Sequence, residues 1–109
     1  MSEPFPALVQ TVYWVDTSIL PAGDAERQRA VVVMAAPPSV AGTVTVVARS
    51  GTDRFGVPHG ADAALGLSAA GRFSRRLPVQ GELWTPAVAS PCGRLDDSTF
   101  AAVVDRFGW

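Results

Sequence analysis

The chain has 109 residues, with ten carboxylates, nine arginines and no lysine, which gives a formal net charge of −1. This length suits a single domain over residues 1–109, and the near-neutral charge disfavours non-specific binding of duplex DNA by the whole surface. The only cysteine, Cys92, excludes an intrachain disulfide and a multi-cysteine metal site. No apolar run approaches the roughly 20 residues that span a bilayer. Because residues 1–6 also lack the basic and apolar regions of a signal peptide, we expect a cytoplasmic protein without a membrane anchor.

The N-terminal quarter predicts a lead-in, a strand and a long loop. Residues 1–7 contain two prolines, which disfavour regular pairing, and are expected to be a loose lead-in. Residues 8–16, LVQTVYWVD, predict the first strand because they are rich in β-branched and aromatic side chains. Residues 17–28 then interrupt the pattern with small and charged side chains. A loop of that length in so small a domain is usually functional or mobile.

A hairpin is predicted next, at the centre of the fold. Residues 30–35 form a continuous apolar run, typical of a strand buried on both faces. Residues 44–47 are all β-branched, which also favours a strand. Between them, residues 36–42 contain two prolines and a glycine, so they are expected to form the turn.

Polar residues gather at the open end of this hairpin. Arg29 enters the first strand, while Arg49, Ser50 and Thr52 lie at the end of the second. Antiparallel pairing brings these strand ends together, so we expect an arginine and a hydroxyl to meet there. Such a pair could stabilise the extra charge on a pentacoordinate phosphorus without a metal.

The second half of the chain predicts shorter elements. Residues 51–60 are expected to be irregular, and residues 61–67 have weak helical character. Residues 72–80 alternate in a way that suits a partly exposed edge strand, with Phe73, Leu77 and Val79 on one face. The two remaining expected elements are a short strand at residues 82–85 and a turn at residues 90–93.

The C-terminus predicts an α-helix. Asp96 suits the N-cap position, and Leu95 and Phe100 suit the hydrophobic staple. Apolar residues recur at i, i+3, i+4 and i+7 from 100 to 107, and Gly108 favours a stop. Five or six short strands with this helix predict a mainly β fold, a small SH3-like barrel with a C-terminal helix.

Common catalytic signatures are missing. The sequence contains no GxxxxGK[ST] phosphate loop, no HExxH and no GxSxG elbow. His59 is the only histidine, which excludes a two-histidine cleavage of RNA within one chain. Its place in a Pro-His-Gly turn favours a solvent-facing position. We expect neither a metal nor a cofactor.

Arginines are the more informative group. Arg72, Arg75 and Arg76 fall within five residues, and Arg49 and Arg54 flank a bend rich in Ser and Thr. Guanidinium groups suit phosphate because their forked donors match two oxygens and stay charged at any working pH. A solvated arginine face that balances the carboxylates explains the same clustering equally well.

The order of motifs resembles that of MazF/PemK-like toxins. Residues 12–16, VYWVD, then a charged loop and residues 29–34, RAVVVM, resemble the family's opening DIxWVD strand, polar loop and RPxVVLS strand. Residues 45–50, TVVARS, resemble the next strand of the family, and residues 78–80, PVQ, resemble its glutamine-bearing strand. Residues 93–97, GRLDD, resemble the start of its closing helix. The resemblance covers nearly the whole chain in order.

This resemblance implies the CcdB/MazF-like form of the small barrel and a cytoplasmic toxin of a toxin–antitoxin pair. Such a toxin is a homodimeric endoribonuclease that a cognate antitoxin inhibits. It cleaves single-stranded RNA (mRNA) at short sequences through attack of the neighbouring 2′-hydroxyl, with no metal or cofactor.

Carried over by position, Arg29 matches the family's catalytic arginine and Ser50 its catalytic threonine, with Thr52 as the alternative hydroxyl. Single-stranded RNA also needs aromatic stacking surfaces, for which Phe55 and Phe73 are candidates that suit a core equally well. Together with the arginine clusters, the expected RNA-binding residues are Arg49, Arg54, His59, Arg75 and Gln80.

Departures from the family pattern keep two alternatives open. Ala30 and Ala35 replace a proline and a serine, Ser50 is followed by glycine where the family has a second threonine, and Glu82 replaces a basic residue. One alternative is a CcdB-like toxin that binds a protein target, with Trp109 of interest unless it packs on its own helix. The other is a catalytically inactive RNA-binding module, which salt-sensitive binding without cleavage would select.

Overall fold

The computed structural model describes residues 7–21, 26–36, 42–52 and 54–108. Within these ranges it contains six strands, three short 3₁₀ helices and one α-helix. The strands are β1 (Thr11–Asp16), β2 (Gln28–Ala35), β3 (Thr43–Ser50), β4 (Val57–His59), β5 (Gly71–Gln80) and β6 (Ala89–Arg94). The helices are η1 (Thr17–Ile19), η2 (Ala63–Leu65), η3 (Gly81–Leu83) and α1 (Asp97–Phe107).

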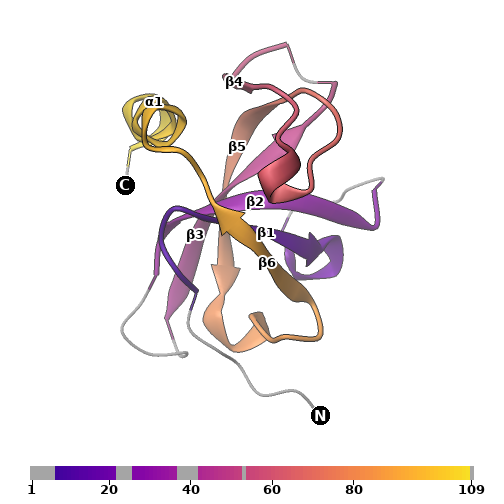
Figure 1. The fold of residues 1–109 in the computed structure, drawn as a ribbon. Coiled ribbons are helices and arrows are strands. Elements are labelled where there is room, and N and C mark those ends of the chain that lie inside the picture. The colour runs from indigo at the N-terminus through magenta and orange to yellow at the C-terminus, as the bar shows by residue number, and fades with distance from the viewer. Residues whose placement is uncertain (1–6, 22–25, 37–41, 53, 109) are drawn as a thin grey trace.

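All six strands belong to one antiparallel sheet, in the order β4-β5-β3-β2-β1-β6. The sheet curls into a half-barrel, with α1 lying beside it (Figure 1). This architecture confirms the predicted mainly β class with a C-terminal helix. Among the described residues, no helix is both long and apolar enough to cross a membrane.

Each face of the sheet carries its own apolar core, and the central strand β2 contributes to both. Val32 and Met34 point into a cluster that also contains residues of α1, which we call the helix-side core. Val31 and Val33 point into the cluster on the other face, which we call the opposite core. This division explains why residues 30–35 are apolar without alternation: a strand that is covered on both faces has no polar side.

The C-terminal helix is confirmed with its predicted ends. The Asp96 side chain accepts a hydrogen bond from the backbone N–H of Thr99 at 2.9 Å. Leu95 and Phe100, the predicted staple, are both buried in the helix-side core. Gly108, with a φ of 76°, ends the helix by donating its N–H to a backbone oxygen.

The predicted turn at residues 90–93 is wrong, because these residues belong to β6. The strand lies at the edge of the sheet, a position that tolerates a proline such as Pro91. Its pairing with β1 steps from Gly93 opposite Val12 to Pro91 opposite Tyr13, so a bulge accommodates the extra residue.

Other predictions needed smaller corrections. The first strand begins at Thr11 because Gln10 adopts a positive φ of 68°. Residues 82–85 are no strand: η3 occupies the first part and is followed by the buried Trp84. The weak helix at 61–67 is reduced to η2, and β4 forms inside the segment expected to be irregular. Most of the predicted turn at 36–42, like most of the lead-in, lies outside the described residues.

The alternation predicted along β5 is interrupted by a bulge. Arg75 pairs with Ala48, but Phe73 pairs with Arg49, which leaves Ser74 as an extra residue between them. Phe73 therefore points into the helix-side core, whereas Leu77 and Val79 belong to the opposite core. Beyond residues 71–73, which pair with β4, the strand is exposed at the sheet edge as predicted.

Candidate functional site

Three polar side chains form a row across the ends of three strands. The register of β2 with β3 pairs Val31 with Ala48, so its continuation by two residues places Arg29 opposite Ser50. On the other side of Ser50, the register of β3 with β5 pairs it with Arg72. Side chains that are directly opposite share a face of the sheet. We call Arg29, Ser50 and Arg72 the arginine–serine row.

The first arginine of this row is held against the neighbouring strand. Arg29 donates a hydrogen bond from Nη1 to the backbone oxygen of Arg49 at 3.2 Å. The contact fixes the guanidinium beside the end of β3, where Ser50 follows. The sequence-based expectation that Arg29 lies near Arg49 and Ser50 is therefore confirmed.

Two hydroxyl groups lie together at the end of β3. The oxygen atoms Oγ of Ser50 and Oγ1 of Thr52 are 3.2 Å apart, and the backbone N–H of Thr52 donates to the Ser50 hydroxyl at 3.2 Å. Ser50 is 8% exposed, whereas Thr52 is an exposed residue. Thr52 thus supplies a second hydroxyl beside that of Ser50.

Two hollows meet at this cluster. The first has a volume of about 320 Å³, and we call it the strand-end hollow; its lining includes Trp14, Gln28, Arg29, Arg49, Ser50 and Thr52. The second, of about 350 Å³, is lined in part by Ser50, Pro58, His59, Gly60, Gly71 and Arg72. Ser50, Gly51 and Ala70 line both hollows, so together they form a depression that runs over the strand ends.

Arg49 is tied down by a dense set of hydrogen bonds. Its Nε donates to Nδ1 of His59 at 3.0 Å, and its Nη2 donates to the backbone oxygens of His59, Gly60 and Ala69 at 3.1, 3.3 and 2.7 Å. Burial lowers the pKa of the Arg49 guanidinium, and the nearby Asp62 carboxylate acts in the opposite direction. Arg49 thus connects residues that line the two hollows, His59 and Gly60 of the second and Ala69 of the first.

His59 accepts a hydrogen bond from Arg49 and is buried, so the expected solvent-facing position is wrong. The residue is only 7% exposed. Because arginine has no acceptor, Nδ1 of His59 must accept from Arg49, and the neutral ring then carries its proton on Nε2. That nitrogen lies 3.3 Å from Oδ2 of Asp62. Both ring nitrogens are engaged, so the geometry gives His59 a structural role rather than a contact with ligand.

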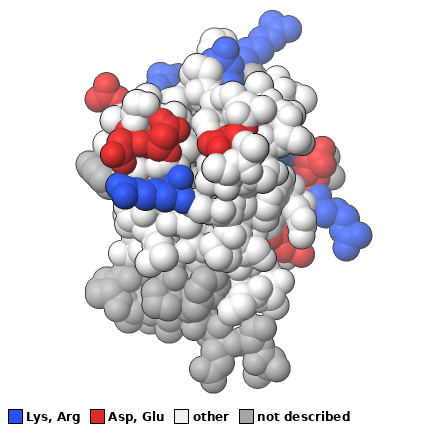
Figure 2. Space-filling model, in the orientation of Figure 1, with Lys and Arg blue, Asp and Glu red and all other residues white. Residues whose placement is uncertain are grey.

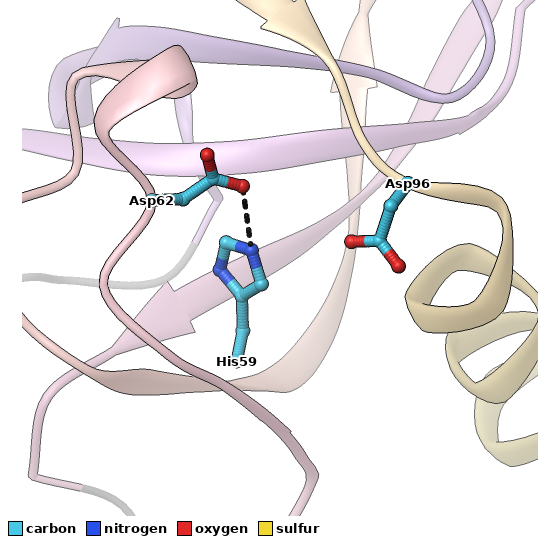
Figure 3. Close-up of side chains that lie close together, drawn as sticks. All are labelled: His59, Asp62 and Asp96. Atoms are coloured by element: carbon cyan, nitrogen blue, oxygen red, sulfur yellow. Dashed lines mark hydrogen bonds and ion pairs between the residues drawn. The ribbon is translucent and has the colours of Figure 1, made fainter.

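The His59 side chain also belongs to a group that could hold a cation. One ligand atom each from His59, Asp62 and Asp96 lies within 4.8 Å of the others. Figure 3 shows these three side chains. Nε2 can bind a metal only without its proton, and moving that proton to Nδ1 would oppose the N–H of Arg49. Asp96 is moreover committed to capping α1. The protonation pattern therefore favours a hydrogen-bonded group over a metal site.

The structure does not gather all of the predicted RNA-binding residues. Gln80 pairs with Thr43 at the far end of β3, seven residues from Ser50 or roughly 23 Å at strand spacing. Arg75 pairs with Ala48, close to the row and on the same face, and Arg54 lies outside the lining of both hollows. The structure therefore brings Arg75, but not Gln80, toward the candidate site.

Charged groups on the visible face do not form one basic surface. Figure 2 shows blue and red side chains interspersed, with large white areas between them, among the described residues on that side. This distribution agrees with the net charge of −1. A polyanion would therefore have to bind a local group of arginines such as the row.

Sequence reasoning missed two aspects of the aromatic surface. Phe73 is fully buried and cannot stack on a ligand, whereas Phe55 is 76% exposed but lines neither hollow. Trp14, which belongs to the strand predicted at residues 8–16, is exposed and lines the strand-end hollow. Its strand gave no sequence signal for this exposure, because the exposure depends on which residues flank it in the sheet.

Fold and site together define a curled antiparallel half-barrel with a cluster of arginines and hydroxyls at the open end of a hairpin. No family model matches the chain, and no curated protein or solved structure matches it either.

Proposed function

We propose that this chain is a metal-independent endoribonuclease that cleaves single-stranded RNA, of the MazF/PemK type. The observation that carries the proposal is the convergence of Arg29, Ser50 and Thr52 on one hollow. Arg29 and Ser50 were selected from motif positions in the sequence, with Thr52 as the alternative hydroxyl, and Arg29 lies 21 residues before Ser50 along the chain. Their meeting supports an arginine–hydroxyl site for phosphate chemistry. The same resemblance leads us to propose a cytoplasmic homodimer that a cognate antitoxin inhibits.

In the proposed reaction, the 2′-oxygen of a ribose attacks the adjacent phosphorus. The P–O2′ bond forms, the P–O5′ bond breaks, and the products carry a 2′,3′-cyclic phosphate and a 5′-hydroxyl. Arg29 would stabilise the added negative charge of the phosphorane, and Ser50 or Thr52 would donate a hydrogen bond to a non-bridging oxygen. Water takes the 2′ proton and supplies the 5′ proton, because His59 is committed to Arg49 and Asp62.

The test is incubation of purified protein with a long single-stranded RNA in excess EDTA. Discrete fragments that end in a cyclic phosphate are expected from the wild-type chain. Arg29→Ala should cleave about 100-fold more slowly or worse, because loss of one group that stabilises transition-state charge typically has that effect. Arg106→Ala is the matched control, since Arg106 is an exposed arginine of α1 that lines neither hollow. RNA that stays intact, or equal rates for wild type and Arg29→Ala, would contradict the proposal.

A second candidate, RNA binding without cleavage, is favoured by the hydrogen bonds of the same residues. Arg29 donates to a backbone oxygen, and Ser50 and Thr52 bond to each other, so all three already have structural partners. Intact RNA that is retained in a salt-sensitive complex would select this function. The candidate that binds a protein target depended on Trp109, which lies outside the described residues.

A further inference from the structure

Trp14 is an unusually exposed tryptophan for the middle of a sheet. It is 38% exposed, whereas Trp84 is fully buried. Trp14 pairs with Ala30 on β2 and with Ser90 on β6. Both neighbours are small, so they leave much of the indole surface uncovered.

The uncovered indole faces a polar site rather than open surface. Trp14 lines the strand-end hollow together with Gln28, Arg29 and Ser50. Its strand partner Ala30 directly follows Arg29, so the backbones of Trp14 and Arg29 lie roughly 6 Å apart at ordinary strand spacing. An aromatic surface therefore stands next to the arginine–serine row.

The hollow crosses the end of the sheet, so side chains from both faces line it. Trp14 shares a face with its partner Ala30, which belongs to the helix-side core. Arg29 and Ser50 continue the opposite face, because successive residues of a strand alternate. A ligand in the hollow would meet the indole on one side of this rim and the arginine and hydroxyl on the other.

We propose that Trp14 forms a nucleobase subsite of the strand-end hollow. The ligand class is a base of a single-stranded nucleic acid, stacked on the indole while an adjoining phosphate reaches the arginine–serine row. Gln28 offers an amide donor and acceptor that suit the hydrogen-bonding edge of a base. The inference rests on the proposed action on RNA and names the residue that holds the base.

Binding of a short RNA that cannot be cleaved tests the subsite directly. The probe is a fluorescently labelled hexanucleotide with 2′-O-methyl groups, which lack the attacking hydroxyl. A ribose-phosphate hexamer of the same length without bases serves as the second probe. Anisotropy gives the Kd of each probe for wild type, Trp14→Ala, Trp14→Phe and the control Phe55→Ala, in which another exposed aromatic residue outside the hollow is removed.

Trp14→Ala should weaken binding of the base-containing probe about tenfold or more, since stacking on an aromatic side chain contributes strongly to each bound base. Trp14→Phe should recover part of the affinity, and Phe55→Ala should stay within about twofold of wild type because Phe55 lines neither hollow. The probe without bases should bind wild type and Trp14→Ala equally. Binding should also quench indole emission in wild type more than in Trp14→Phe.

The subsite fails if Trp14→Ala binds the base-containing probe as wild type does, or if it weakens both probes equally. Because the probe resists cleavage, this result is separate from nuclease activity. If binding depends on Trp14 but the protein never cleaves RNA, the endoribonuclease proposal is wrong and the subsite proposal stands. Cleavage of RNA by Trp14→Ala with an unchanged KM would keep the endoribonuclease and remove the subsite. Failure of wild type to bind either probe would also remove the subsite, while the cleavage assay decides the endoribonuclease separately.

Discussion

At the scale of single residues, Gly71 marks how closely the chain packs around the candidate site. A Cβ atom at this position would lie 2.9 Å from the backbone oxygen of Ser50 and 3.0 Å from Nη1 of Arg49. Glycine therefore permits β5 to approach the end of β3 at this point. Gly60 also lines the second hollow, but a Cβ there would meet no atom within 4 Å.

Gly71→Ala should therefore destabilise the protein and disturb the site, whereas Gly60→Ala should do neither. The expected cost for Gly71→Ala is about 1–3 kcal/mol, which is typical of overpacking, and RNA binding should weaken because Ser50 and Arg49 must shift. Urea denaturation and the anisotropy assay measure the two effects. Equal behaviour of the two variants would show that the approach of β5 to β3 is looser than described.

The buried imidazole of His59 gives a second residue-level expectation. His59→Ala removes the acceptor of the Arg49 Nε–H, so the free energy of unfolding should fall by about 1–3 kcal/mol, the usual cost of leaving a buried polar group unpaired. His59→Asn should recover part of this loss, because its side-chain oxygen can accept the same hydrogen bond. Urea denaturation of both variants checks this, and equal stability of His59→Ala and wild type would contradict it.

The approach of Arg29 to Ser50 was predictable, because antiparallel pairing of β2 and β3 decides it. Thr52 lies beyond β3, and its contact with Ser50 depends on the bend that follows the strand. The burial of His59 was not predictable from its Pro-His-Gly turn. It depends on Arg49 and Asp62, which lie ten residues before it and three after it. The exposure of Trp14 depends on small neighbours in two other strands, which local sequence does not reveal.

At the scale of elements, the helix α1 is the one whose start is best explained. The Asp96 carboxylate accepts hydrogen bonds from the backbone N–H and the hydroxyl of Thr99 and from the hydroxyl of Ser98. These hydrogen bonds lower the pKa of Asp96, the backbone one most of all. The helix depends on this cap because the first N–H groups of a helix have no partner within it.

Removal of the cap should have a cost that depends on pH. Asp96→Ala should lose about 1 kcal/mol of stability at neutral pH. Because the folded-state pKa is below the unfolded one, the stabilisation in wild type is complete above the unfolded pKa and disappears as pH falls through the folded pKa. The difference between wild type and Asp96→Ala in urea denaturation should therefore shrink on acidification. A difference that grows toward low pH would contradict the assignment.

The strand β6 could not be predicted from its local sequence. Ser-Pro-Cys-Gly has the composition of a turn, yet it forms β6 because an edge strand tolerates proline and a bulge tolerates an extra residue. The helix, by contrast, is set by its own cap and apolar period, and it was predictable to its ends. The strands with clear β-branched or apolar runs, β1, β2, β3 and β5, were also predicted, whereas β6, which the sheet edge and a bulge permit, was not.

At the scale of the whole molecule, the net charge of −1 limits how RNA can bind. The arginine–serine row offers two guanidinium groups, so few phosphates can be neutralised. For two contacts with a single strand, the slope of log K against log salt should be roughly −1.4. A slope several times steeper would require a larger basic surface than the row.

A substitution of Arg72 tests whether this arginine contacts a phosphate of the RNA. Arg72→Ala should reduce the salt slope by about 0.7, the loss of one phosphate contact on a single strand. Arg106→Ala should leave the slope unchanged because Arg106 lines neither hollow. Anisotropy titrations at several salt concentrations measure these slopes, and equal slopes for wild type and Arg72→Ala would remove Arg72 from the binding site.

Because Ser74 is an extra residue in a bulge, β5 can lose one residue at this point and keep its pairing with β3. Phe73 and Arg72 keep their pairing with Arg49 and Ser50 whether or not a residue bulges out before them. Deletion of Ser74 would therefore straighten the strand without turning Phe73 out of the core or Arg72 off its face. A one-residue deletion in a regular strand instead turns the side chains beyond it to the other face. Homologues of this chain are thus expected to vary in length by one residue at this point of β5 and to keep the arginine opposite the serine.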